Sequence, residues 1–136
     1  MSASFDNLFS IKGKTALVTG GSRGIGEMIA AGFMAHGAKV YISSRKAKVC
    51  EATAERLSQT YGGKCIALPA DLSNLAGVES LAAQLAEHES KLDILVNNAG
   101  ASWGAPRCSP EYPACFHAQR VARLSLIHIS EPTRPY

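Results

Sequence analysis

The sequence predicts an α/β fold built on a parallel sheet, because two kinds of segment alternate along its first hundred residues. Short, bulky apolar runs occur at 15–19, 39–43 and 65–70, and a fourth strand with the turn that leaves it occupies 93–100. Longer amphipathic stretches with helical spacing separate these runs. This β-α-β-α-β-α-β order implies parallel strands joined by right-handed crossovers.

The first strand, TALVT at 15–19, is typical of strands buried on both faces of a parallel sheet. It leads through a glycine-rich turn into a first helix, and Gly37 follows where a helix C′ residue belongs. The residues of this helix that repeat at helical spacing, and that we expect to form its apolar face, are Ile25, Met28, Ile29, Gly32 and Phe33.

Two further helices are predicted from their apolar faces and their ends. The second, at 46–61, should turn Val49, Thr53 and Leu57 inward and stop at the glycine pair that follows it. Ser73 or Asn74 can cap the third helix. The apolar face of this third helix comprises Leu75, Val78, Leu81, Ala82 and Leu85.

Composition excludes several classes of protein. The 136 residues, 46% hydrophobic and 18% charged, predict one globular domain. No apolar run approaches the ~20 residues that cross a bilayer, and the first residues lack a secretory signal pattern. The four cysteines form no CxxC pair and no metal-ligand spacing, so we expect reduced thiols, a cytoplasmic location and no metal.

The formal charge of +3 does not indicate a nucleic-acid partner. Most of the basic excess comes from arginines within the last thirty residues, which are not clustered into a stripe and not interleaved with aromatic side chains. We therefore expect neither nucleic acid nor a membrane as a partner.

The glycine-rich segment TGGSRGIG, at 19–26, leaves the first strand and opens the first helix. Gly20 permits a tight turn, Gly24 lets backbone approach a pyrophosphate, and Gly26 lets helix and strand pack closely. The helix N-terminus then offers free N–H groups and a positive dipole end to phosphates. The segment predicts nucleotide binding, and the alternative is a glycine turn with a structural role alone.

The TGxxxGxG spacing, together with NNAG at 97–100, resembles the short-chain dehydrogenase/reductase family over residues 12 to about 106. KGKTALVTGGSRGIG and DILVNNAGASWGAP look most like its 3-oxoacyl-[acyl-carrier-protein] reductase branch. The resemblance implies a Rossmann-type, doubly wound parallel sheet of which the N-terminal half is present. The implied strand order is 3-2-1-4, with the first two helices on one face and the third on the other.

The resemblance also implies a cofactor site. Its pyrophosphate loop would comprise Gly20, Gly21, Ser22, Arg23, Gly24, Ile25 and Gly26. Asp71, followed by Leu72, would face the adenine amino group, or would instead be a capping or turn aspartate. Asn97 would hold the fourth strand and border the adenosine ribose. Asn98, Ala99 and Gly100 would shape the turn beneath the nicotinamide.

The end of the second strand favours NADP(H) over NAD(H). NAD-preferring members carry an acid there to bind the ribose 2′-OH, whereas this chain has Ser43, Ser44 and Arg45 and no acid before Glu51. An arginine fork with a serine hydroxyl matches a 2′-phosphate, and Arg23 is placed to help. The alternative is that Arg45 only begins the next helix in solvent.

The family's proton-donating tyrosine with a lysine four residues later is not found in the sequence. Tyr41 is followed at that spacing by Arg45, Tyr61 by Cys65 and Tyr112 by Phe116, and Tyr136 is the last residue. We therefore assign no catalytic residue and expect the chain itself to be inactive. The parent enzyme implied by the resemblance is a homo-oligomer that reduces a small-molecule ketone or 3-oxoacyl thioester.

The last residues continue none of these patterns. LSLIHISEPTR, at 124–134, resembles the in-frame translation of a transposase library adaptor, and the alternative is a natural amphipathic strand. We expect a lead-in at 1–12, an NADP(H)-binding half-domain at 13–106, a departure from the family at 107–123 through a possible frame error, and a non-native tail at 124–136. The chain is thus predicted to be the N-terminal part of an oxidoreductase, with a non-catalytic nucleotide-binding module as the rival hypothesis.

Overall fold

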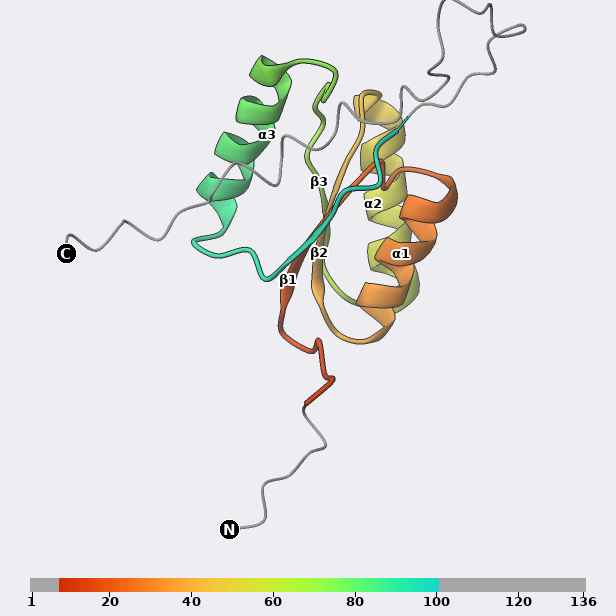
Figure 1. Cartoon of the computed structure of the whole chain (residues 1–136). Helices are drawn as coiled ribbons and strands as arrows, with labels where there is room; N and C mark the ends of the chain where they lie inside the picture. Colours follow the sequence, from red (N-terminus) through yellow and green to blue (C-terminus); the bar gives the residue numbers. More distant parts are fainter. Residues whose placement is uncertain (1–7, 101–136) are drawn as a thin grey trace, which may run out of the picture.

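The computed structural model describes residues 8–100, which form a four-stranded sheet with helices on both faces (Figure 1). The elements are β1 (Thr15–Thr19), α1 (Gly24–Ala35), β2 (Lys39–Ser43), α2 (Ala47–Tyr61), β3 (Cys65–Ala67), α3 (Leu75–His88) and β4 (Ile94–Val96). The expected features at 107–123 and 124–136, and most of the lead-in, lie outside the described residues.

All strand pairs are parallel, and the order β3-β2-β1-β4 confirms the predicted order. β1 lies between β2 and β4, with Ala16 beside Val40 on one side and beside Ile94 on the other. Because every strand runs the same way, all carboxyl ends meet at one edge of the sheet. We call this edge, where β1, β2, β3 and β4 end, the carboxyl edge.

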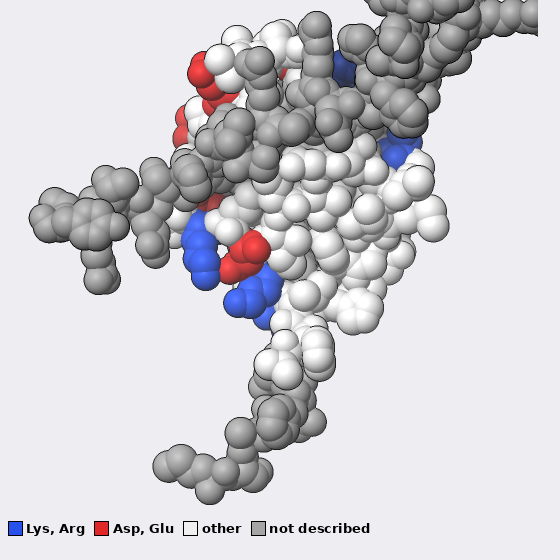
Figure 2. All heavy atoms as spheres, viewed as in Figure 1, with Lys and Arg blue, Asp and Glu red and all other residues white. Residues whose placement is uncertain are grey.

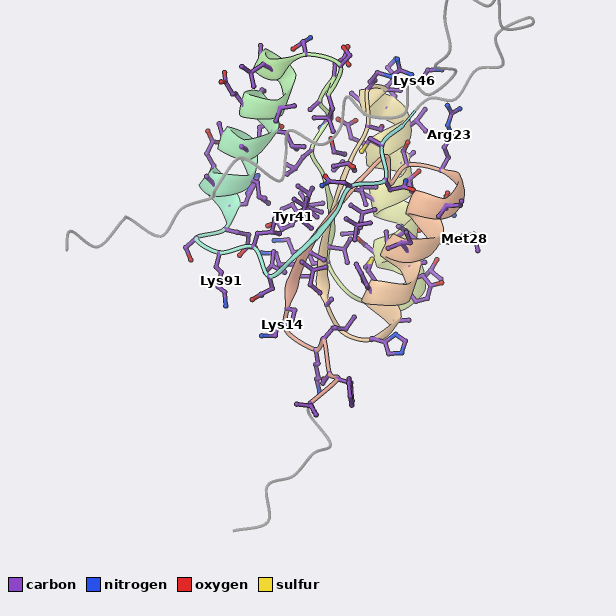
Figure 3. The ribbon with its side chains drawn as sticks, in the orientation of Figure 1. Lys14, Arg23, Met28, Tyr41, Lys46 and Lys91 are labelled. Atoms are coloured by element: carbon purple, nitrogen blue, oxygen red, sulfur yellow. The ribbon has the colours of Figure 1, made fainter. Side chains whose placement is uncertain are left out.

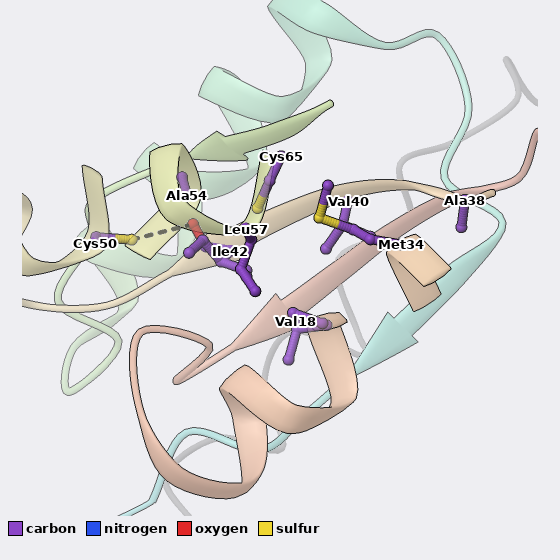
Figure 4. Close-up of a cluster of buried hydrophobic side chains, with 10 residues drawn as sticks. Val18, Met34, Ala38, Val40, Ile42, Cys50, Ala54, Leu57 and Cys65 are labelled. Atoms are coloured by element: carbon purple, nitrogen blue, oxygen red, sulfur yellow. Dashed lines mark hydrogen bonds between the residues drawn. The ribbon is translucent and has the colours of Figure 1, made fainter. Parts of the chain in front are cut away.

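The helices cover the two faces as predicted, with α1 and α2 on one face and α3 on the other (Figure 1). Side chains alternate along each strand, so Val18, Val40 and Ile42 pack toward α1 and α2 (Figure 4). Leu17 and Tyr41 instead pack with α3.

The expected apolar face of α1 is partly wrong. Ile25 and Met28 are 70% and 73% exposed, Gly32 is exposed as well, and the buried residues are Gly26, Ala30 and Met34. Ile29 and Phe33 are partly buried against the core, as expected. Gly26 and Ala30 are small, so the first turns of the helix can lie close to the sheet while Ile25 and Met28 stay exposed.

Similar corrections apply at three other positions. Val49 is exposed while Cys50 and Ala54 join the correctly predicted Thr53 and Leu57 inside. Leu75, in the first turn of α3, is also exposed. β3 ends at Ala67 rather than at residue 70, although Leu68 N and Ala70 N still donate to Ile42 O and Ser44 O beyond its end.

The helix ends follow the sequence closely. Gly37 and Gly62 take the left-handed conformation, with φ of +79° and +66°, as expected of residues that end helices. Of the two candidate caps for α3, Asn74 is the one that caps, because its side chain accepts a hydrogen bond from Gly77 N at 2.8 Å.

Hydrogen bonds and ion pairs lie at the edge of the sheet opposite the carboxyl edge, near where the strands begin. Tyr41, fully buried, donates its hydroxyl to Glu89 at 2.7 Å, and Glu89 also pairs with Lys39. Asp93 accepts from Thr15 N and lies between Lys14 and Lys91. Figure 2 shows such acidic and basic groups side by side at the lower end of this face.

None of the helices in the described part of the chain is long and apolar enough to span a membrane. Within the same residues, 8–100, no cluster of three or more His, Cys, Asp or Glu side chains is arranged to hold a metal ion.

Candidate functional site

The glycine-rich loop between β1 and α1 is fastened to the end of β2. Gly20 N and Gly21 N both donate to Ser43 O, at 2.7 and 3.2 Å. A Cβ on Gly21 would lie 2.7 Å from a methyl carbon of Ile42, so any larger residue there would push the loop away from β2. The loop therefore lies directly on the carboxyl edge.

A second set of hydrogen bonds fastens the loop to the turn that leaves β4. The Thr19 hydroxyl donates to Val96 O at 3.3 Å and accepts from Asn98 N and Ala99 N, both at 3.0 Å. Asn98 Nδ2 donates to Thr19 O and Gly20 O, at 3.3 and 3.4 Å. The Asn98 amide and the Thr19 hydroxyl thus join the turn after β4 to the loop.

Sequence reasoning missed the part that Thr19 plays here. The position of Thr19 in the sequence is the signal that could have revealed this role. Thr19 is the last residue of β1, one beyond Val18, which pairs with Val96. A hydroxyl at that position faces the turn leaving the neighbouring strand.

The N-terminus of α1 is open for a ligand. Its N-cap residue, Arg23, has an extended backbone and makes no side-chain hydrogen bond to the first turn, unlike Asn74 at α3. Gly24 and Ile25 are exposed, and Gly24 takes a left-handed φ of +59°. Orphan N–H groups and the positive dipole end at such a terminus suit an anion.

Gly26 explains why the loop and α1 can come so close. A Cβ there would overlap Gly20 O and would lie 2.5 Å from Asn98 Nδ2. Only a residue without a side chain leaves room for the loop, the first turn of α1 and the Asn98 amide together. This close approach is the role that the sequence predicted for Gly26.

Ser44 and Arg45 follow β2 at the same edge. Ser44 is half-buried, and its carbonyl accepts from Ala70 N at 3.1 Å, which holds the end of β2 beside the chain leaving β3. Arg45 is exposed. Its side chain is therefore accessible to an anion.

Asp71 makes the turn contact that was considered as the alternative to a ligand role. Its Oδ1 accepts from Ser73 N at 3.0 Å, and this hydrogen bond, together with the nearby charge of Arg45, lowers the pKa of Asp71. The carboxylate is exposed, and the bond uses one of its two oxygens. Leu72, beside it, is buried against α3.

The structure thus brings the predicted loop, Ser44, Arg45, Asp71 and the turn at 97–100 to one edge of the sheet. Figure 3 shows Arg23 and Lys46 at this end of the molecule, with Lys14 and Lys91 at the other. The edge offers a backbone cradle under a helix N-terminus, exposed guanidinium groups and a carboxylate. Such a set can bind an extended phosphorylated nucleotide, because it combines hydrogen-bond donors for the phosphates with a carboxylate that accepts hydrogen bonds.

The comparisons with known proteins define the class. The family described as short chain dehydrogenase matches residues 14–119, and the chain belongs to this family. The match continues past residue 106, where the sequence was expected to leave the family pattern.

Among individual proteins, the chain is similar to the rhamnolipids biosynthesis 3-oxoacyl-[acyl-carrier-protein] reductase of Pseudomonas aeruginosa, with 59% identity over 71% of this chain and 37% of that one. The solved Pseudomonas aeruginosa RhlG/NADP active-site complex aligns with a TM-score of 0.66 and 58% identity, over 69% of this chain and 37% of the other. L-sorbose reductase of Gluconobacter frateurii, solved with NADPH and L-sorbose, aligns with a TM-score of 0.69 and 31% identity, over 75% of this chain and 40% of the other. The chain spans 29% to 37% of the length of the curated relatives described in these comparisons.

Proposed function

We propose that residues 14–100 bind NADP(H) along the carboxyl edge. We further propose that a protein containing this unit transfers hydride between the cofactor and a ketone or 3-oxoacyl thioester. One observation carries the proposal: α1 begins without a side-chain cap behind a loop in which Gly21 and Gly26 leave no room for a Cβ. Backbone N–H groups in such a cradle can approach a pyrophosphate directly.

The loop would hold the pyrophosphate. The N–H groups of residues 22–26 would face the phosphates, because Gly20 N and Gly21 N are already bonded to Ser43 O. Those two bonds and the Asn98 amide keep the loop in place. A preorganised loop favours binding, since little conformational entropy is lost when the phosphates arrive.

The residues after β2 would select NADP(H). Arg45 is exposed, Ser44 is half-buried beside it, and no acid stands there to repel a 2′-phosphate. A guanidinium binds phosphate through two parallel hydrogen bonds. Asp71 would face the adenine amino group with the oxygen that Ser73 N does not use, and residues 97–100 would border the ribose and nicotinamide.

The bound cofactor would supply the hydride, and reduction of a carbonyl also needs a group that protonates the oxygen. The sequence holds no tyrosine followed four residues later by lysine. We propose that the 136-residue chain binds the cofactor without reducing a carbonyl, and that the reaction belongs to a protein that adds a proton donor to this unit.

The similar proteins support the choice of cofactor and substrate class. One is a 3-oxoacyl-[acyl-carrier-protein] reductase at 59% identity, and two similar solved structures are complexes with NADP or NADPH. One of these complexes also contains the sugar ketone L-sorbose, so similar proteins act on more than one kind of carbonyl compound.

Calorimetric titration of the purified chain with NADPH and NADH tests the proposal. The chain should bind NADPH more tightly than NADH. Arg45→Asp should weaken NADPH binding by about 10- to 100-fold and change NADH binding little, because a charge-assisted phosphate contact is lost. Lys64→Asp is the matched control, since it makes the same charge change at an exposed residue just before β3, at the opposite edge. Equal weakening of both cofactors by Arg45→Asp would remove Arg45 from the phosphate site.

A further inference from the structure

Thr53 on α2 makes a hydrogen bond to the glycine-rich loop, which the other hydroxyls of its helix do not reach. Ser58 and Thr60 both bond to the carbonyl four residues back, at 2.8 Å in each case, and Ser58 also accepts from Cys65 N at the start of β3. Thr53 instead donates to Ser22 O in the glycine-rich loop, 31 residues away in sequence, at 2.9 Å. Both Thr53 and Ser22 are buried, at 4% and 8% exposure.

This bond determines which way one peptide unit of the loop faces. The peptide between Ser22 and Arg23 is trans, because no described peptide bond is cis, and in a trans peptide the C=O and N–H point in opposite directions. With the Ser22 carbonyl held toward α2, the Arg23 N–H points away from α2. Arg23 is the N-cap residue of α1, so its N–H belongs to the anion cradle at that helix end.

We infer that Thr53 is a positioning residue for the pyrophosphate part of the cofactor site, an inference that rests on the proposed function. It touches no cofactor atom and acts through the orientation of the Ser22–Arg23 peptide. Without the Thr53 hydroxyl, the Ser22 carbonyl is a buried acceptor without a partner. Reversal of the peptide would relieve this, but it would turn a carbonyl oxygen toward the phosphates in place of an N–H donor.

The variant Thr53→Val removes the hydroxyl and keeps the side-chain shape, and Thr53→Ser restores the donor. Thr60→Val is the matched control, because it removes an exposed hydroxyl of the same helix that bonds within the helix. Two probes separate the parts of the site: NADPH, which contains the pyrophosphate, and adenosine 2′-monophosphate, which has no phosphate at the 5′ position.

Dissociation constants are measured by titration for the complete chain and each variant, with circular dichroism to verify folding. We expect Thr53→Val to weaken NADPH binding about tenfold, because one hydrogen-bond donor to the phosphates is lost. Adenosine 2′-monophosphate should bind as before, Thr53→Ser should regain most of the NADPH affinity, and Thr60→Val should change neither. Thr53→Ala, which removes the same hydroxyl, takes the place of the valine variant if that variant does not fold.

The outcomes distinguish this inference from the function on which it rests. If the unchanged chain binds NADPH and Thr53→Val binds it equally well, the positioning role is wrong and the proposed function stands. The same holds if Thr53→Val weakens both probes equally, since the hydroxyl then supports the fold in general. If the unchanged chain binds neither probe, the proposed function fails and the inference fails with it.

Discussion

Replacing Gly26 with alanine should destabilise the fold, because this glycine lies where three backbone segments meet. A Cβ at Gly26 overlaps Gly20 O and approaches Asn98 Nδ2 to 2.5 Å. Neither neighbour can move away easily. Gly20 N is bonded to Ser43 O, and the Asn98 amide is bonded to Thr19 O and Gly20 O.

The size of the effect follows from these contacts. Forcing extra volume into a packed site costs about 1–3 kcal/mol, and displacement of the two long Asn98 bonds adds about 0.5 kcal/mol each. Alanine in place of glycine in a helix returns about 0.5–1 kcal/mol. The net loss is about 1–3.5 kcal/mol, which lowers the Tm of a domain of this size by roughly 5–25 °C.

Thermal unfolding followed by circular dichroism measures the effect, and Gly32→Ala is the matched control. Gly32 lies in the same helix, is exposed, and has no heavy atom within 4 Å of an added Cβ. Alanine there should raise the Tm by about 3–6 °C through helix propensity alone. The reasoning is refuted if Gly26→Ala unfolds at or above the Tm of the unchanged chain.

Two further predictions concern titratable groups. Hydrogen bonds from Lys39 and Tyr41 lower the pKa of Glu89 from its ordinary 4.5, so its carboxylate stabilises the fold above that pH, and this stabilisation is lost as pH falls through the folded pKa. Glu89→Gln should therefore cost about 1 kcal/mol at pH 7 and progressively less toward pH 3 in thermal melts, and an equal loss at both pH values would contradict this. Burial raises the pKa of Cys65 to about 12 and also raises that of Cys50. Iodoacetamide should therefore label these two thiols at pH 8 only after denaturation, as peptide mapping can measure. Labelling of the folded chain at the rate of the denatured chain would contradict this prediction.

The strands and helix ends were well predicted where one physical cause dominates. β1 and β2 have the predicted bounds, because a bulky run ended by glycine or serine has few alternatives. The face of α1 was harder to predict, since small residues such as Gly26 and Ala30 are buried for close approach rather than for their hydrophobicity.

The candidate site shows the same division. The glycines of the loop could be identified from their spacing, because a tight turn and a close approach each require that residue type. The contacts that hold the loop could not, since Thr19 meets Val96 and Thr53 meets Ser22 only after strands and helices distant in sequence have packed. A threonine hydroxyl has no pattern in sequence that distinguishes such a bond from an ordinary one within its helix.

Amide hydrogen exchange with and without NADPH tests the central claim most directly, because it reports where on the chain the cofactor lies. NADPH should slow exchange in the loop at 20–26 and around Ser44, Arg45 and Asp71, and should leave the opposite edge near Glu89 unchanged. The cofactor site at the carboxyl edge would be contradicted if NADPH binds without slowing exchange in the loop, or slows it only near Glu89.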